Sequence, residues 1–133
     1  MKLAKDCDTR LYYGFDVDGV KKIIEGFIFS EETEALSHFS TQLVEALREI
    51  EQEVIKKEGK IIYSAGDNIL FYGKFAESWC HEILNSFKQK AGYSASFGIG
   101  STITEFYLAL RLAKSKGGGL VVRYQAPMSV NDR

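Results

Sequence analysis

Two apolar runs separated by a very short polar connection are the feature that most limits how this chain can fold. The runs are Lys60 to Ala65 and Asn68 to Tyr72, and only Gly66-Asp67 lies between them. So short a connection between two runs of strand-forming residues is typical of a β-hairpin. We therefore predict a sheet that contains this hairpin, with the Asp67 carboxylate at its tip.

A second acidic strand end lies near the N-terminus. Leu11 to Phe15 is rich in aromatic residues and predicts a buried strand, which Asp16 and Asp18 follow directly. Gly19 then turns the chain into a short helical turn. Two strand ends that each present a carboxylate can lie side by side in one sheet, and paired carboxylates favour a divalent cation such as Mg²⁺ and phosphoryl transfer.

The rest of the chain alternates between helical and strand patterns. Apolar residues recur at three- and four-residue steps in three segments, and two further apolar runs predict strands. Ser30 is expected to cap the first of these helices, and Thr102 with Glu105 is typical of a capping box at the start of the last. The predicted helices run from Ser30 to Gly59, from Ala76 to Gly92 and from Thr102 to Lys116, and the predicted strands from Tyr93 to Ile99 and from Leu120 to Tyr124.

The predicted order of elements is β, α, β, β, α, β, α, β, and its first six members match the split βαβ, ferredoxin-like arrangement. We therefore predict an α+β fold, a ferredoxin-like palm with a βαββαβ core plus an additional αβ. The sheet should be mixed but rich in antiparallel pairs, with the helices on one face. In this topology the first strand neighbours the hairpin, which brings Asp16 and Asp67 together. We expect one palm domain over residues 1–124 and a flexible tail over 125–133.

Composition sets the outer limits of the function. A chain of 133 residues, 45% of them hydrophobic, can bury one sizeable core. The net charge of −1 disfavours long nucleic acid as a partner and suits a nucleotide-sized anion. Two cysteines are too few for a disulfide framework or a zinc site, and neither a membrane span nor a signal peptide is evident. We expect a cytoplasmic protein that does not contact a membrane.

Four segments, in order along the chain, resemble the motifs of GGDEF diguanylate cyclases. Asp16-Val-Asp-Gly-Val-Lys21 is similar to their Asp-Ile-Asp-x-Phe-Lys, and Ser64-Ala-Gly-Asp-Asn-Ile69 falls where their Gly-Gly-(Asp/Glu)-Glu-Phe hairpin belongs. Ser96-Phe-Gly-Ile-Gly100 is similar to their Ser-Ile-Gly strand, and Ala109-Leu-Arg-Leu-Ala-Lys114, followed by Gly117, to their Ala-Leu-x-x-Ala-Lys-x-x-Gly.

Within that superfamily the chain looks closer to the palm of the type III CRISPR polymerase subunit, whose hairpin reads Gly-Gly-Asp-Asp. A free-standing palm of this size most resembles the minimal CRISPR polymerases (mCpol) of bacterial antiphage defence. The resemblance implies synthesis of a cyclic oligonucleotide signal from ATP, with release of pyrophosphate and with Mg²⁺ or Mn²⁺, two ions per site. A cyclic di-adenylate is the expected product, made by a homodimer and read by a separate effector protein.

The resemblance also implies roles for individual residues. Asp16, the Val17 carbonyl and Asp67 would be metal ligands, and Asn68 would join the two aspartates in catalysis. The residues expected to bind the nucleotide and its phosphates are Asp18, Gly19, Val20, Lys21, Ser64, Gly66 and Lys114. The backbone N–H groups at Gly19 and Val20 suit a phosphate, because they open a helical turn.

Three positions depart from the relatives' patterns. Ala65 replaces the first hairpin glycine and Asn68 the second acid, while Ile24 stands where diguanylate cyclases place an asparagine that reads guanine. An apolar side chain cannot supply those hydrogen bonds, so adenine is the expected base. A cyclic AMP cyclase and a non-catalytic nucleotide sensor are the alternatives. An RNA-binding ferredoxin-like module is the least favoured, because the charge is near neutral and a strand end is acidic.

Overall fold

The computed structural model describes residues 9–125, so the predicted tail lies outside the described part except for Gln125. None of the helices within residues 9–125 is long and apolar enough to cross a membrane. The elements are β1 (Leu11–Val17), α2 (Val20–Phe29), α3 (Thr33–Lys56), β2 (Lys60–Ser64), β3 (Asn68–Gly73), α4 (Glu77–Ala91), β4 (Ala95–Gly100), α5 (Ile103–Ser115) and β5 (Val121–Arg123).

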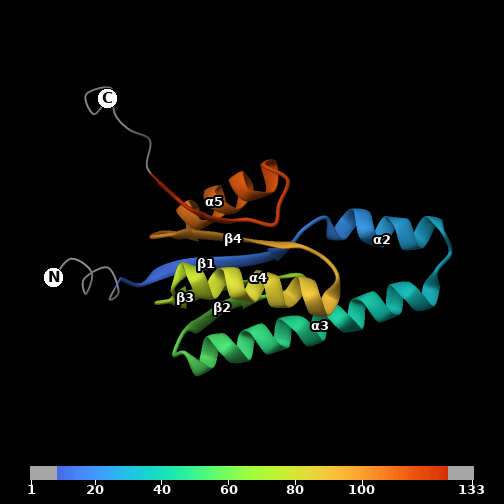
Figure 1. Cartoon of the computed structure of the whole chain (residues 1–133), viewed down its shortest axis with the longest axis horizontal. Helices are drawn as coiled ribbons and strands as arrows, with labels where there is room; N and C mark the ends of the chain where they lie inside the picture. Colours follow the sequence, from blue (N-terminus) through green and yellow to red (C-terminus); the bar gives the residue numbers. More distant parts are fainter. Residues whose placement is uncertain (1–8, 126–133) are drawn as a thin grey trace.

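The five strands form one mixed sheet in the order β2-β3-β1-β4-β5 (Figure 1). The pairs β2–β3, β3–β1 and β1–β4 are antiparallel, and only β4–β5 is parallel. The first strand therefore lies between β3 of the hairpin and β4, as the ferredoxin-like topology requires. The predicted α+β fold with an antiparallel-rich mixed sheet is confirmed.

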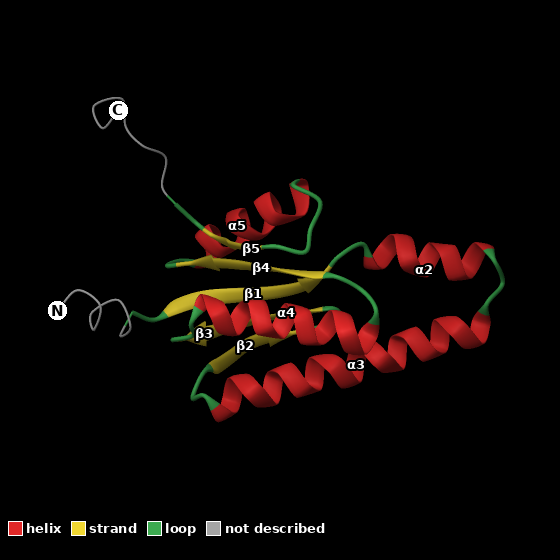
Figure 2. Ribbon diagram, viewed as in Figure 1, coloured by secondary structure: helices red, strands yellow, loops and turns green. Residues whose placement is uncertain are grey.

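One face of the sheet carries the main core. Alternate residues of β1 point to this face, and Tyr13, Phe15 and Val17 are at most 2% exposed. Their register partners on β3 and β4, which include Phe71 and Phe97, are fully buried beside them. Helices α3 and α4 cover this face, and both contribute residues to the same buried cluster (Figure 2).

The prediction that all the helices lie on one face is wrong for α5. This helix packs on the opposite face, over β1 and β4, where Gly14 and Gly98 are register partners. A Cβ at Gly98 would come within 2.5 Å of the Leu110 nitrogen and of the Phe106 carbonyl oxygen. Because these glycines have no side chains, the helix lies directly on the strands. This close packing determines where the end of α5 meets the end of β1.

The segment after β1 is a full helix rather than the predicted short turn. Helix α2 spans ten residues, and its apolar positions Ile23, Ile24 and Phe27 follow helical spacing and pack partly against the core. Ser30 ends α2, with its N–H bonded to the Gly26 carbonyl, so the prediction that Ser30 caps the next helix is wrong. Helix α2 and the first part of α3 extend past the end of the strands (Figure 1).

The other predicted caps are present. The Thr102 hydroxyl accepts a hydrogen bond of 3.1 Å from the Glu105 N–H, which confirms the N-cap of α5. The Glu105 carboxylate accepts in return from the N–H of Ser101 at 2.9 Å, one residue before the expected partner. Gly92 ends α4 in the left-handed conformation, with φ of 81°.

Candidate active site

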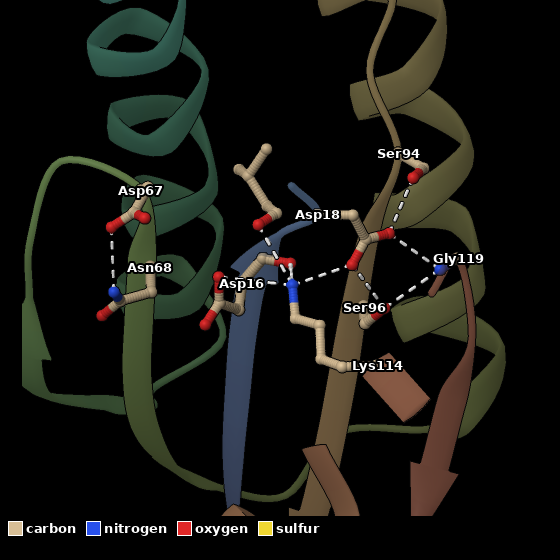
Figure 3. A network of polar contacts seen from close by, with 9 residues as sticks. Asp16, Asp18, Asp67, Asn68, Ser94, Ser96, Lys114 and Gly119 are labelled. Atoms are coloured by element: carbon tan, nitrogen blue, oxygen red, sulfur yellow. Dashed lines mark hydrogen bonds and ion pairs between the residues drawn. The ribbon is translucent and has the colours of Figure 1, made fainter. Parts of the chain in front are cut away.

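The end of β1 and the tip of the β2–β3 hairpin meet at one edge of the sheet. Asp16 is the register partner of Asn68, and the Val17 N–H donates a hydrogen bond of 3.0 Å to the Asp67 carbonyl oxygen. Figure 3 shows Asp16 and Asp67 on these two neighbouring strands. The topology therefore brings the two carboxylates together as the sequence predicts.

Asp16 is a carboxylate with incomplete charge neutralisation. Its side chain is 27% exposed. Burial raises the pKa of Asp16 above its usual range, the charge of Asp67 raises it further, and Lys114 opposes the rise. The folded chain thus disfavours the ionised form of Asp16. A cation bound beside this carboxylate would stabilise the ionised form.

Asp67 has only a local partner. Its Oδ1 accepts a hydrogen bond of 3.0 Å from the Asn68 side-chain amide, and among the described residues no other side chain donates to it. Asn68 replaces the relatives' second acid, and here it orients the Asp67 carboxylate through this bond. The remaining oxygen of Asp67 is free to bind a cation.

Asp18, in contrast, is surrounded by hydrogen-bond donors. Its Oδ1 accepts from Ser96 at 2.9 Å and from Lys114 at 2.8 Å. Its Oδ2 accepts from Ser94 at 2.7 Å and from the Gly119 N–H at 2.8 Å (Figure 3). Burial alone would raise the pKa of Asp18, but the hydrogen bonds from Lys114 and the two serines outweigh it and lower the pKa.

Three of the donors to Asp18, namely Ser94, Ser96 and Gly119, are site residues that the sequence did not predict. Ser96 lies in the Ser-Phe-Gly-Ile-Gly segment, but nothing in the sequence places its hydroxyl on Asp18. Gly119 follows Gly117 and Gly118, and all three have positive φ. A Cβ at Gly118 would lie 2.5 Å from Asp18 Oδ2, so this loop closes over the carboxylate.

Lys114, near the end of α5, crosses from the helix to the end of β1. Its Nζ donates to the carbonyl oxygens of Asp16 at 3.1 Å and Val17 at 3.0 Å. It also lies 2.8 Å from Asp18 Oδ1 and 3.4 Å from Asp16 Oδ1. One ammonium group therefore contacts both aspartates of the Asp-x-Asp segment.

Of the other predicted nucleotide-binding residues, some lie near this edge of the sheet and one points away from it. Gly19, at φ of 66°, caps α2, and Val20 begins it. Lys21 is exposed on the first turn of the same helix. Ser64 lies on the far side of the hairpin, where its hydroxyl bonds to Glu51 of α3 instead of facing the carboxylates.

Two clefts flank the carboxylates. A cleft of about 450 Å³ between α2 and α3, here called the α2–α3 cleft, reaches Gly66 and Asp67 and is otherwise lined mostly by apolar residues, Ile24 among them. A second cleft of about 460 Å³, the α5 cleft, reaches Asp16 from the other side. It is lined by Asp16, Tyr107, Leu110, Arg111, Lys114 and Ser115.

The donor set fits a hard divalent cation that keeps other ligands. Two carboxylates and the Val17 carbonyl are oxygen donors of the kind that Mg²⁺ prefers, and Mg²⁺ usually takes only one or two carboxylates and completes its shell with water and phosphate. Within residues 9–125 no cluster of three or more His, Cys, Asp or Glu side chains is placed to hold a metal. The protein would therefore supply part of a coordination shell, and a nucleotide would supply more.

Comparisons with known proteins show which fold the chain shares. The solved structures similar to this chain include the GGDEF domain of DgcB from Caulobacter crescentus in complex with c-di-GMP, at 12% identity and a TM-score of 0.59, with 92% of this chain and 81% of that chain covered. A GGDEF domain from Pseudomonas aeruginosa gives 12% identity and a TM-score of 0.57, with 99% and 92% covered. A diguanylate cyclase/phosphodiesterase from Caldicellulosiruptor saccharolyticus gives 14% identity and a TM-score of 0.53, with 92% and 82% covered.

These likenesses show the fold, which is that of the GGDEF palm. No protein of curated function matches the chain by sequence. The family model of the minimal CRISPR polymerase domain matches residues 12–124, from the second residue of β1 to just past β5. That span includes both carboxylate-bearing strand ends and Lys114. The chain therefore belongs to the minimal CRISPR polymerase (mCpol) family.

Proposed function

We propose that the chain is a metal-dependent nucleotidyltransferase that joins ATP molecules into a cyclic oligonucleotide, most simply a cyclic di-adenylate. Membership of the polymerase family and the GGDEF-like fold support a reaction of the nucleotide cyclase or polymerase type. The observation that carries the proposal is the meeting of Asp16 and Asp67 at one sheet edge, between two clefts large enough for parts of a nucleotide.

In the proposed reaction a ribose hydroxyl of one ATP attacks the α-phosphorus of another. A new P–O bond forms, the bond between the α- and β-phosphates breaks, and pyrophosphate leaves, while the hydroxyl proton passes to solvent. A second attack of the same kind closes the ring. Most of the catalysis in such transfers comes from positioning and from stabilising the charge on the phosphates.

The residues of the chain divide this work. Asp16, Asp67 and the Val17 carbonyl would hold Mg²⁺ or Mn²⁺, which when bound neutralises phosphate charge and polarises the attacked phosphorus. Two ions per site would need the phosphates as shared ligands. The backbone N–H groups at Gly19 and Val20, at the start of α2, would donate hydrogen bonds to phosphate oxygens. Lys21 and Lys114 would add positive charge.

The α2–α3 cleft supports adenine as the base. Ile24 lies in its lining, together with Val20 and Phe39, and the cleft opens onto Gly66 and Asp67 beside the carboxylates. Apolar side chains can pack against either purine, but they pair none of the polar groups at the base edge, and guanine, with O6, N1–H and its N2 amino group, has more of these groups than adenine. Burying those groups without partners would cost binding free energy, so a guanine nucleotide is disfavoured.

A second copy of the chain would complete the reaction. One palm offers one pair of metal-binding carboxylates, so two facing copies would bring two nucleotides together, and a homodimer with the active sites at or near the interface is the simplest assembly. We further propose that the product is a signal in antiphage defence, read by a separate effector protein.

The test is to incubate the purified chain with each NTP and Mg²⁺ or Mn²⁺ and to identify the products by mass spectrometry. We expect a cyclic adenine dinucleotide and pyrophosphate from ATP, and no product from the Asp67→Ala variant. A Lys90→Ala variant is a matched surface control, because Lys90 pairs with Glu49 on α3, among residues that do not line either cleft at the site. Product formation by Asp67→Ala at the wild-type rate would overturn the proposal.

Two other outcomes would point to the alternatives. Cyclic AMP as the sole product would identify a mononucleotide cyclase. Binding of ATP with no product from any NTP would favour a nucleotide sensor, which the replacement of an acid by Asn68 also supports, because that substitution removes one negative charge from the metal site.

A further inference from the structure

Lys114 contacts two of the three groups that are proposed above to bind the metal ion. Its ammonium group has three N–H donors, and four oxygens lie within 3.4 Å of it. Among these oxygens are the Val17 carbonyl, at 3.0 Å, and Asp16 Oδ1, at 3.4 Å. Both belong to the ligand set that is proposed above for Mg²⁺ or Mn²⁺.

An ammonium group and a divalent cation cannot share these two oxygens at close range. Mg²⁺ binds oxygen at about 2.1 Å, so an ion on the Val17 carbonyl and the Asp16 carboxylate would lie within a few ångströms of the nitrogen. Repulsion between the two positive charges is strong at such a separation, because the site is partly buried and poorly screened. Metal entry therefore requires that the ammonium move.

The structure provides room and a pivot for that movement. The α5 cleft is lined by Lys114 itself together with Asp16, Arg111 and Tyr107, so the side chain borders open space. Asp18 stays fixed by Ser94, Ser96 and Gly119 whether or not Lys114 moves. The long, flexible lysine stem would let the ammonium keep its bond to Asp18 Oδ1 while it leaves the Val17 and Asp16 oxygens.

We propose that Lys114 is a resident counter-cation of the metal site, which occupies the ligand oxygens in the nucleotide-free chain and gives them up when metal and triphosphate bind. The inference rests on the proposed function, since it assumes that Asp16, Val17 and Asp67 bind the metal. A triphosphate offers the displaced ammonium new oxygens, so nucleotide favours metal entry, and by thermodynamic linkage metal favours nucleotide equally. Metal alone binds weakly.

The test measures Mn²⁺ binding in the absence of nucleotide, with the electron paramagnetic resonance signal of the free ion as the readout. We expect the Lys114→Met variant to bind Mn²⁺ at least about ten-fold more tightly than the wild type, a typical size for coupling between sites. Lys116→Met removes a neighbouring exposed charge at the end of α5 and should leave the affinity within about two-fold. Equal or weaker binding by Lys114→Met would overturn the inference.

Two further variants test whether the gain in affinity comes from loss of the Lys114 charge. Removing Lys114 also leaves the Asp18 carboxylate without its cation, so Lys114→Met/Asp18→Asn must still bind Mn²⁺ more tightly than the folded Asp18→Asn variant does. Equal binding by these two variants would assign the gain to Asp18 and overturn the inference. Lys114→Gln keeps hydrogen-bond donors without the charge, and it serves where thermal unfolding shows that Lys114→Met is not folded. It too must bind Mn²⁺ more tightly than the wild type.

Asp16→Asn separates this inference from the proposed function. If Asp16→Asn abolishes Mn²⁺ binding while Lys114→Met leaves the affinity unchanged, the metal site stands and the counter-cation role fails. If Asp16→Asn and Asp67→Asn both bind Mn²⁺ like the wild type, the metal site itself is wrong, and the proposed function fails with it.

Discussion

Asp18 and Asp67 lie at the same edge of the sheet, but their surroundings are opposite. Asp18 accepts hydrogen bonds from two serines, a lysine and a backbone N–H, and its side chain is only 15% exposed. Asp67 accepts one side-chain bond, from its own neighbour Asn68. The first carboxylate is saturated by the protein, and the second is left with capacity to bind a ligand.

The difference shows how one residue type can serve two purposes at one site. The donors on Asp18 are Ser94 just before β4, Ser96 in β4, Lys114 of α5 and Gly119 of the loop after α5, so the carboxylate ties three segments to the end of β1. The Asp67 side chain accepts only from its own hairpin. We infer that Asp18 builds the site and that Asp67, with Asp16, acts in it. The predictions that follow test that division.

The largest effect is expected from Asp67→Asn. Loss of a metal ligand should reduce the rate of pyrophosphate release from ATP by more than about 100-fold, beyond the usual effect of residues that only support a ligand. Circular dichroism should show an unchanged fold, because Asp67 carries little structure. A variant that keeps more than a tenth of the wild-type rate would remove Asp67 from the metal site.

Asp18→Asn should act on stability instead. Asp18 accepts from Ser94 and the Gly119 N–H at one oxygen and from Ser96 and Lys114 at the other, whereas an amide has only one acceptor oxygen. Partly buried donors therefore lose their partner, and we expect a loss of about 2 to 3 kcal/mol in the free energy of unfolding. Urea denaturation measures the loss. A stability equal to that of the wild type would mean that the network around Asp18 is not structural.

The stability difference between the wild type and Asp18→Asn should also depend on pH, and it should shrink in acid. The folded chain lowers the pKa of Asp18 below its ordinary value of 3.8, so the stabilisation is present above pH 3.8 and is lost as the pH falls through the folded pKa. The wild type should exceed Asp18→Asn in stability at pH 7 and pH 5, and the two should converge in stronger acid. A gap that widens on acidification would contradict the assignment.

A pair of glycine substitutions compares the two regions by sterics alone. Gly118 has φ of 78°, and an added Cβ would meet the Asp18 carboxylate at 2.5 Å, so Gly118→Ala should lower the free energy of unfolding by about 2 kcal/mol. Gly66, beside Asp67, has nothing within 4 Å of an added Cβ, and Gly66→Ala should change stability by less than about 0.5 kcal/mol. Equal effects, measured by denaturation, would erase the contrast.

The smallest effect on stability is expected from Asp16→Asn. Because burial and Asp67 raise the pKa of Asp16, ionisation of this carboxylate weakens the folded state above pH 3.8. Removing the charge should therefore raise the midpoint of thermal unfolding slightly at pH 7, while nucleotide synthesis is lost. A lower midpoint at pH 7 would show that the attraction to Lys114 outweighs burial.

The sequence predicts what depends on local pattern. The hairpin, the N-cap at Thr102 and the meeting of Asp16 with Asp67 follow from strand patterns, turn chemistry and topology, and the structure shows all three. The sequence does not predict the full length of α2, because its apolar residues follow directly on the turn signal at Gly19.

Long-range contacts account for the other differences. The position of α5 on the opposite face depends on Gly14 and Gly98, which become a flat seat only when β1 and β4 pair. The donors on Asp18 come from residues more than seventy positions away, as in the bond from Ser94. No spacing in the sequence shows that this aspartate, rather than Asp16, is the saturated one.

A crystal structure with Mn²⁺ and a non-hydrolysable ATP analogue tests the central claim most directly, because anomalous scattering locates the ion. We predict an anomalous peak coordinated by Asp16, Asp67 and the Val17 carbonyl, with the adenine in the α2–α3 cleft and Asp18 still bonded to Ser94 and Ser96. An ion coordinated by Asp18, with Asp67 left out of its shell, would contradict the division of the two carboxylates into builder and ligand.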